Sequence, residues 1–225
     1  MTIILTNDDG IDAPGIRALQ QAVDKPATIV APNRQYSGCG HQVTTNRGLK
    51  LEKRSPTEYA LEGTPADCTR IAIDKIAPNT KLVLSGINAG GNLGTDVYIS
   101  GTVAAVREAA IHGIPGIAIS HWIKKPLILD WSVATRWASR VLKDLISRPS
   151  PPGSFWNVNL PHLEPEQPEP KIILCEPSTA PLPIDYRLEG DTYHYQGEYA
   201  KRDRTPGTDV DICFGGNIAV TLIRL

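Results

Sequence analysis

Two carboxylates, Asp8 and Asp9, stand side by side one residue beyond the apolar run TIILT at residues 2–6. Neighbouring carboxylates repel, and each makes the other harder to ionise unless a positive group lies near both. A hard divalent cation would remove the repulsion, because Mg²⁺ and Mn²⁺ prefer oxygen ligands. Gly10 lets the chain leave the strand, so both side chains can face one ligand. The alternative is a solvated turn that caps the next helix.

Asn88 and Asn92 lie four residues apart in the glycine-rich segment SGINAGGNLGTD at residues 85–96. The glycines permit close approach of the backbone to a ligand. An asparagine side chain offers a neutral oxygen to a metal or an amide donor to an anion. The segment is neither a Walker phosphate loop nor a dinucleotide-binding glycine motif. A flexible loop without a ligand is the alternative.

Ser100, Gly101 and Thr102 open a predicted helix, TVAAVREAAIHG at residues 102–113. Ser100 is a good N-cap, and the N–H groups of the following residues would point outward. Such a helix start can bind phosphate through its free donors and the helix dipole. Ordinary capping uses the same geometry, so both interpretations stay open.

Ser37 lies among glycines in the segment YSGCGHQVT at residues 36–44. It could be a metal ligand, a nucleophile or a turn residue, although the surrounding residues do not form a G-x-S-x-G nucleophile elbow. His41 is close enough in the sequence to line the same site. A loop histidine without a catalytic role is the alternative for that residue.

The elements that must position these residues alternate between strand and helix, which predicts an α/β fold with a mostly parallel, doubly wound sheet. Expected strands lie at 2–7, 27–32, 47–54, 57–63, 81–86, 116–120, 156–161 and 171–176, and expected helices at 14–24, 63–76, 102–113 and 129–146. Ligands of such sheets bind beyond the carboxyl ends of the strands. The four polar segments are therefore expected to converge at one edge.

We expect one domain over residues 1–225, with its core at about 1–175. The polar stretch 176–209 is expected to form a β-rich arm, a hairpin or a subunit contact. Residues 210–225 show a strand-like pattern and are expected to close the chain as a strand.

The composition limits the classes of function and partner that are expected. The 225 residues are 41% hydrophobic, with a formal net charge of −1, so neither a nucleic acid polymer nor a membrane is favoured as a partner. The N-terminus lacks the basic region of a signal peptide, and no stretch reaches the roughly 18 apolar residues of a membrane span. The four cysteines are widely spaced. A cytoplasmic location is expected.

Together these segments resemble the SurE (survival protein E) family. The resemblance is carried by TNDDGIDAPGIRAL, APNRQYSG, GTPADCT, SGINAGGNLGTDV and SGTVAAVREAAIHGIPGIAIS, and less strongly by NVNLP and PGTDVDICFGGNIAVTLI. It is dense over residues 1–120 and patchy beyond.

The resemblance implies a Rossmann-like, three-layer α/β/α fold and a metal-dependent 5′-nucleotidase, which hydrolyses nucleoside 5′-monophosphates and could extend to 3′-nucleotides or short polyphosphate. It implies a homodimer or homotetramer. It also implies one divalent cation per subunit, Mg²⁺ or Mn²⁺, held by Asp8, Asp9, Ser37 and Asn88. Substrate phosphate would be bound by Asn92, Ser100, Gly101 and Thr102.

The favoured mechanism has the metal act as a Lewis acid and orient or activate a water molecule. Asp8 as general base or as nucleophile stays open. A haloacid-dehalogenase-type phosphatase is one alternative, but it needs D-x-D spacing, whereas Asp8 and Asp9 are adjacent. A non-catalytic receiver-like module that binds Mg²⁺ is the other, although such a module has about half this length.

Overall fold

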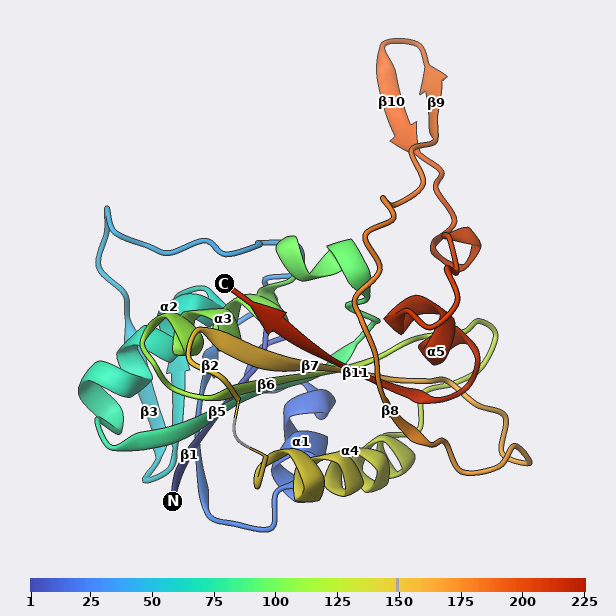
Figure 1. Cartoon of the computed structure of the whole chain (residues 1–225). Helices are drawn as coiled ribbons and strands as arrows, with labels where there is room; N and C mark the ends of the chain where they lie inside the picture. Colours follow the sequence, from blue (N-terminus) through green and yellow to red (C-terminus); the bar gives the residue numbers. More distant parts are fainter. Residues whose placement is uncertain (149) are drawn as a thin grey trace.

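The computed structural model describes residues 1–148 and 150–225. Its main sheet contains β1 (Thr2–Thr6), β2 (Ala27–Pro32), β3 (Leu51–Ser55), β4 (Glu58–Leu61), β5 (Thr80–Ala89), β6 (Gly116–His121), β7 (Ser154–Leu160), β8 (Ile172–Leu174) and β11 (Ile218–Arg224). Their order across the sheet is β3-β4-β2-β1-β5-β6-β7-β11-β8. Helices cover both faces of this sheet (Figure 1).

The sheet is mostly parallel. Strand β1 pairs in parallel with both β2 and β5, and β5, β6 and β7 continue in parallel. Two pairs are antiparallel, β3 with β4 and β11 with β7. The chain winds outward from β1 in one direction and from β5 in the other. The gap between their carboxyl ends is therefore the topological switch point, where ligands of doubly wound sheets bind.

Side chains of the buried strands alternate between two helix layers. In β1, Ile3 and Leu5 join the apolar cluster that contains α1 (Pro14–Ala22) and α4 (Trp131–Leu145). Ile4 instead joins the cluster with α2 (Pro65–Ile71) and α3 (Gly101–Ile111). A strand that is apolar on both faces fits this sandwich position. The predicted three-layer α/β/α fold is confirmed.

The helix starts follow the local sequence. Pro14 and Pro65 occupy the first helical turns of α1 and α2, where the missing N–H costs nothing. Thr64 caps α2 and forms a reciprocal capping box with Asp67, while Ser100 caps α3. Short helical segments complete the helices: η1 (Ala72–Ile76), η2 (Gly94–Tyr98) and η3 (Tyr199–Lys201).

The expectation of a closing strand over residues 210–225 is wrong for its first part. Asp209–Phe214 forms a helix, α5, and the strand is confined to β11. Val210 and Cys213, three residues apart, face one apolar cluster, which suits a helical turn. The Asp209 carboxylate accepts backbone N–H groups of Gly94, Ser178 and Val210 at 2.7–2.9 Å, which ties the start of α5 into the fold.

Within residues 176–209, β9 (Tyr186–Glu189) and β10 (Thr192–Tyr195) form an antiparallel hairpin. The hairpin projects from the body of the molecule (Figure 1), and all eight of its strand residues are exposed. Within the described residues, no helix is long and apolar enough to cross a membrane.

Candidate active site

Asp8 lies at the carboxyl end of β1, beside the first turn of α3. The Thr102 hydroxyl donates to Asp8 Oδ1, and the Tyr36 backbone N–H donates to the Asp8 carbonyl at 2.7 Å. Burial raises the pKa of Asp8 to about 6, and the charge of Asp9 adds to this rise, while the Thr102 hydrogen bond opposes it. Neither aspartate forms a salt bridge within the described chain. We call Asp8 and Asp9 the acidic corner. It carries negative charge without a salt bridge to a cationic side chain of the described chain.

Ser37 and Asn88 approach the same corner. The Gln35 amide donates to Ser37 Oγ at 2.8 Å and to Asp9 Oδ1 at 3.3 Å, so these two oxygens share one donor. The backbone N–H of Ala89, the residue after Asn88, lies 3.5 Å from Asp9 Oδ2. Asn88 donates its own amide to the Gly90 carbonyl at 2.8 Å, which leaves its side-chain oxygen for a ligand.

This donor set fits a hard divalent cation. Two carboxylates, a hydroxyl and an amide oxygen are the ligand types that Mg²⁺ and Mn²⁺ prefer. The neutral Gln35 amide donates to both Asp9 and Ser37, so oxygens of these two residues lie within reach of a single group. Across residues 1–148 and 150–225, no cluster of three or more His, Cys, Asp or Glu side chains is arranged to hold a metal. Any cation here would thus depend on the neutral oxygens of Ser37 and Asn88.

The N-terminus of α3 points into the same corner. Ser100 Oγ accepts the Val103 N–H at 3.2 Å as an N-cap. Among the described residues, the Gly101 N–H forms no hydrogen bond with the protein, whereas the Thr102 N–H is close enough to the Asp8 carboxylate to lower its pKa. Free N–H groups at the positive end of a helix dipole bind anions well. A candidate phosphate site therefore lies directly beside the candidate cation site.

Gly101 is required by this close packing. A Cβ atom at position 101 would lie 2.8 Å from Asp8 Cβ and 3.0 Å from Cys39 Sγ. Both are closer than ordinary carbon contacts, so a larger residue would push the helix away from Asp8.

Asn92 is buried, as are the other phosphate candidates, and its polar groups already have partners within the protein. Its side-chain amide donates to Ser120 Oγ at 2.8 Å, and Ser120 pairs with Asn88 between β5 and β6. The backbone carbonyl of Asn92 accepts hydrogen bonds from the side-chain amides of Asn157 and Asn159. Within the described chain it forms no hydrogen bond with Ser100, Gly101 or Thr102. Asn92 is thus hydrogen-bonded to residues of β6 and β7, and its role in binding phosphate stays a prediction.

The sequence patterns did not predict two polar side chains near the candidate site. Gln35 joins Asp9 to Ser37, and its position two residues before Ser37 was the available signal. Glu108 is buried in α3 and binds His41 of the loop that carries Ser37. Its distance of 67 residues from His41 left no local signal.

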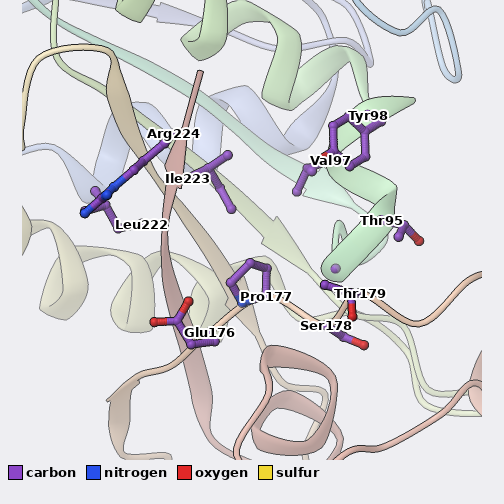
Figure 2. A pocket seen from close by; sticks show the side chains of 11 residues that line it. Thr95, Val97, Tyr98, Glu176, Pro177, Ser178, Thr179, Leu222, Ile223 and Arg224 are labelled. Atoms are coloured by element: carbon purple, nitrogen blue, oxygen red, sulfur yellow. The ribbon is translucent and has the colours of Figure 1, made fainter.

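A cavity of about 730 Å³ lies away from this corner. Its walls are η2 with Tyr98, residues 176–179, and the end of β11 at residues 222–224 (Figure 2). It contains none of the predicted site residues. Size alone therefore does not locate the chemistry in this molecule.

The fold and the site define a class: α/β/α proteins in which a candidate cation site adjoins a candidate phosphate site at the switch point of a parallel sheet. The family described as Survival protein SurE matches residues 3–180. This chain belongs to that family, as the resemblance predicted.

Similar proteins agree with this assignment. A Nostoc sp. protein named "Putative 5'-nucleotidase alr3139" is 62% identical over the full length of both chains. A Heliobacterium modesticaldum protein named "5'-nucleotidase SurE" is 40% identical over all of this chain and 86% of its own. The crystal structure of the SurE protein from Aquifex aeolicus has a TM-score of 0.86 and 32% identity, and covers all of this chain and 93% of that one.

Proposed function

We propose that this chain is a divalent-metal-dependent phosphatase that hydrolyses nucleoside 5′-monophosphates to nucleoside and phosphate. The observation that supports this proposal is that hydrogen bonds link Asp8 and Asp9 to the N-terminus of α3 and to the segments that carry Ser37 and Asn88. The family match and the 5′-nucleotidase names of its relatives support the same activity.

In the proposed reaction a water oxygen bonds to phosphorus, the ester P–O bond breaks, and the nucleoside leaves with a proton. The N–H groups of Gly101 and Thr102 hold the phosphoryl oxygens and stabilise their charge. Asp8, Asp9, Ser37 and Asn88 would hold one Mg²⁺ or Mn²⁺, which supplies Lewis-acid activation when bound. Thr102 fixes Asp8 Oδ1, so Oδ2 is the oxygen left for a cation or a proton.

The nucleoside is proposed to extend along the 33–50 loop, the segment between β2 and β3. This loop carries Ser37 and lines a polar cavity of about 390 Å³ with Arg34, Tyr36, Thr64 and residues 42–47. Hydroxyl, amide and guanidinium groups there can bind the polar edges of a ribose or a base.

The test is phosphate release from 5′-AMP, GMP, CMP and UMP, with 3′-AMP and p-nitrophenyl phosphate for comparison. We expect release from 5′-nucleotides that EDTA abolishes and that Mn²⁺ or Mg²⁺ restores. Full activity in EDTA would refute the metal assignment. The absence of release from every phosphomonoester would refute the enzyme itself.

The two alternatives from the sequence are not favoured by the family match. A phosphoenzyme trapped on Asp8 would nevertheless revive an aspartyl-phosphate mechanism. Labelling by acetyl phosphate without turnover would revive the receiver-like interpretation.

We also propose that the protein is a homo-oligomer to which the β9–β10 hairpin contributes. Its exposed Tyr186, Leu188, Tyr193 and Tyr195 would be buried by a second subunit. Size-exclusion chromatography with light scattering would test this. The cytoplasmic location stays a prediction.

A further inference from the structure

Glu108 is an unusual acidic residue outside the acidic corner. Its side chain is 3% exposed and lies on α3, yet it contacts three basic side chains from three parts of the chain. His41 of the 33–50 loop lies 2.7 Å from Oε2, while Arg70 of α2 and His112, the C-cap of α3, lie 3.1 and 3.0 Å from Oε1. A buried carboxylate needs such partners.

Those partners keep Glu108 ionised. Burial alone would raise its pKa, but the hydrogen bonds from His41 and His112 and the charges of His41 and Arg70 outweigh it and hold the pKa below its ordinary value. An ionised acceptor forms stronger hydrogen bonds than a neutral one. The contact to His41 is therefore suited to holding a loop.

The position of Glu108 along α3 relates the His41–Glu108 contact to the candidate active site. Glu108 lies seven residues after Gly101, which is two helical turns, so both residues lie on one face about 10 Å apart. Gly101 packs against Asp8 at one end of that face, and His41 binds at the other. One rigid helix thus contacts both the acidic corner and the loop that carries Ser37.

Ser37 lies between two anchored points of the loop. Before it, the Tyr36 N–H is bonded to the Asp8 carbonyl at 2.7 Å. After it, the Gly40 N–H is bonded to the Ile99 carbonyl at 3.0 Å, and His41 is bonded to Glu108. Gly38 and Gly40 both have positive φ, a conformation that glycine adopts without steric cost. Cys39 packs against Gly101, and His41 is the first side chain after Ser37 that forms a hydrogen bond with α3 in the described chain.

We propose that His41 and Glu108 are positioning residues that hold Ser37 in place for the cation and keep the 33–50 loop over the nucleotide. This inference rests on the proposed function, because it assigns Ser37 to the cation site. Neither residue touches the reacting atoms in this arrangement. Their contribution is to the affinity for the cation and for the substrate.

The structure supplies a matched control, since three side chains share one carboxylate and one of them belongs to the loop. His41→Ala removes the loop contact, whereas His112→Ala removes a contact made within α3. His41→Gln keeps an N–H donor at a similar reach. Mn²⁺ affinity would be measured from the electron paramagnetic resonance signal of free Mn²⁺, together with kcat, KM for AMP and Tm.

We expect His41→Ala to weaken Mn²⁺ binding and to lower kcat/KM by about 10-fold each, equivalent to about 1.4 kcal/mol. His112→Ala should change either quantity less than about 2-fold at a similar Tm, and His41→Gln should recover most of the loss. Equal effects of His41→Ala and His112→Ala on Mn²⁺ affinity would overturn the proposal. A wild-type protein that hydrolyses no nucleotide would refute the proposed function instead, and the Mn²⁺ affinities would still decide the role of His41.

Discussion

Two buried acidic regions of this molecule differ in how their charge is balanced. At the acidic corner, Asp8 is 5% exposed, neighbours Asp9 and forms no salt bridge with the described residues. Near η2, Asp96 is 4% exposed and its Oδ2 accepts Arg202 at 2.7 Å, the Tyr199 hydroxyl at 2.6 Å and the Leu93 N–H at 2.9 Å. One carboxylate is left without a cation and the other is fully paired.

The two regions differ in their roles: the paired Asp96 cluster joins parts of the fold, whereas the acidic corner belongs to the candidate active site. Arg202 also donates to the Leu93 carbonyl and lies over the Tyr199 ring, so the Asp96 cluster joins the C-terminal segment to the loop after β5. Asp8 and Asp9 also contact distant segments, through Thr102, Gln35 and Ala89, but none of these partners carries a positive charge. A buried charge without a partner marks a place where a ligand completes the electrostatics.

Asp8→Asn should give the largest effect. We expect kcat/KM to fall at least about 1,000-fold, or about 4 kcal/mol of transition-state stabilisation, because a proposed ligand of the cation is lost. The free energy of unfolding at pH 7.5 should stay unchanged or rise, since burial already disfavours the ionised side chain. Phosphate release and urea unfolding check both parts. Asp12→Asn, at an exposed carboxylate, is the control, and wild-type turnover of Asp8→Asn would contradict the site.

Asp96→Asn tests the paired region. The change leaves the Arg202 guanidinium buried without its counter-charge, so the free energy of unfolding should fall by about 3–5 kcal/mol. Urea unfolding measures it. Glu198→Gln, in the exposed pair with Lys201, should change stability by less than about 0.5 kcal/mol. Equal effects of the two substitutions would erase the distinction between the regions.

Gly101→Ala tests how tightly the acidic corner is packed. The added Cβ meets Asp8 and Cys39, so we expect about a 100-fold loss of kcat/KM and a stability loss of about 1–3 kcal/mol. Gly113→Ala, at positive φ but facing open space, should cost about 1 kcal/mol and leave kcat/KM unchanged. Steady-state kinetics of both variants decide the matter, and unaltered kinetics of Gly101→Ala would count against the close packing.

His121→Gln tests a buried group that the fold keeps neutral. Burial lowers the pKa of His121 to about 4 from 6.5, and the charge of His162 lowers it further, while the hydrogen bond to the Trp122 carbonyl opposes the shift. Between pH 6.5 and 4 the unfolded chain takes up this proton and the folded chain does not. Stability is therefore lost as the pH falls through that window, by up to about 1.4 kcal/mol per pH unit.

Replacing His121 by Gln should flatten this part of the pH dependence. Urea unfolding of both proteins at pH 7, 6 and 5 would measure the difference. Parallel curves for the two proteins would show that His121 does not carry the effect.

Much of the fold follows from local pattern. The apolar runs gave the central strands, and Pro14, Thr64 and Ser100 mark helix starts that the structure reproduces. The strand predicted for residues 210–214 is wrong because the spacing of the apolar residues there is compatible with both a strand and a helix. Asp209 then ties it as a helix through N–H groups from Gly94 and Ser178, which lie far away in the sequence.

The candidate site was also predictable only in part. Strand ends and glycine-rich loops pointed to Asp8, Asp9 and Asn88, because residues at the carboxyl edge of a parallel sheet must meet. The bonds of Thr102 to Asp8, of Glu108 to His41 and of Asp96 to Arg202 span 94, 67 and 106 residues. Such pairings arise from the packing of whole elements and leave no periodic trace in the chain.

The β9–β10 hairpin has a consequence for how the molecule opens. Two strands with both faces in solvent bury too little apolar surface to be stable alone. Amide protons of residues 186–195 should therefore exchange with solvent through local opening, at a free energy far below that of global unfolding. The sheet and its acidic corner would stay closed during these events, so opening of the hairpin would not expose the candidate site to the solvent.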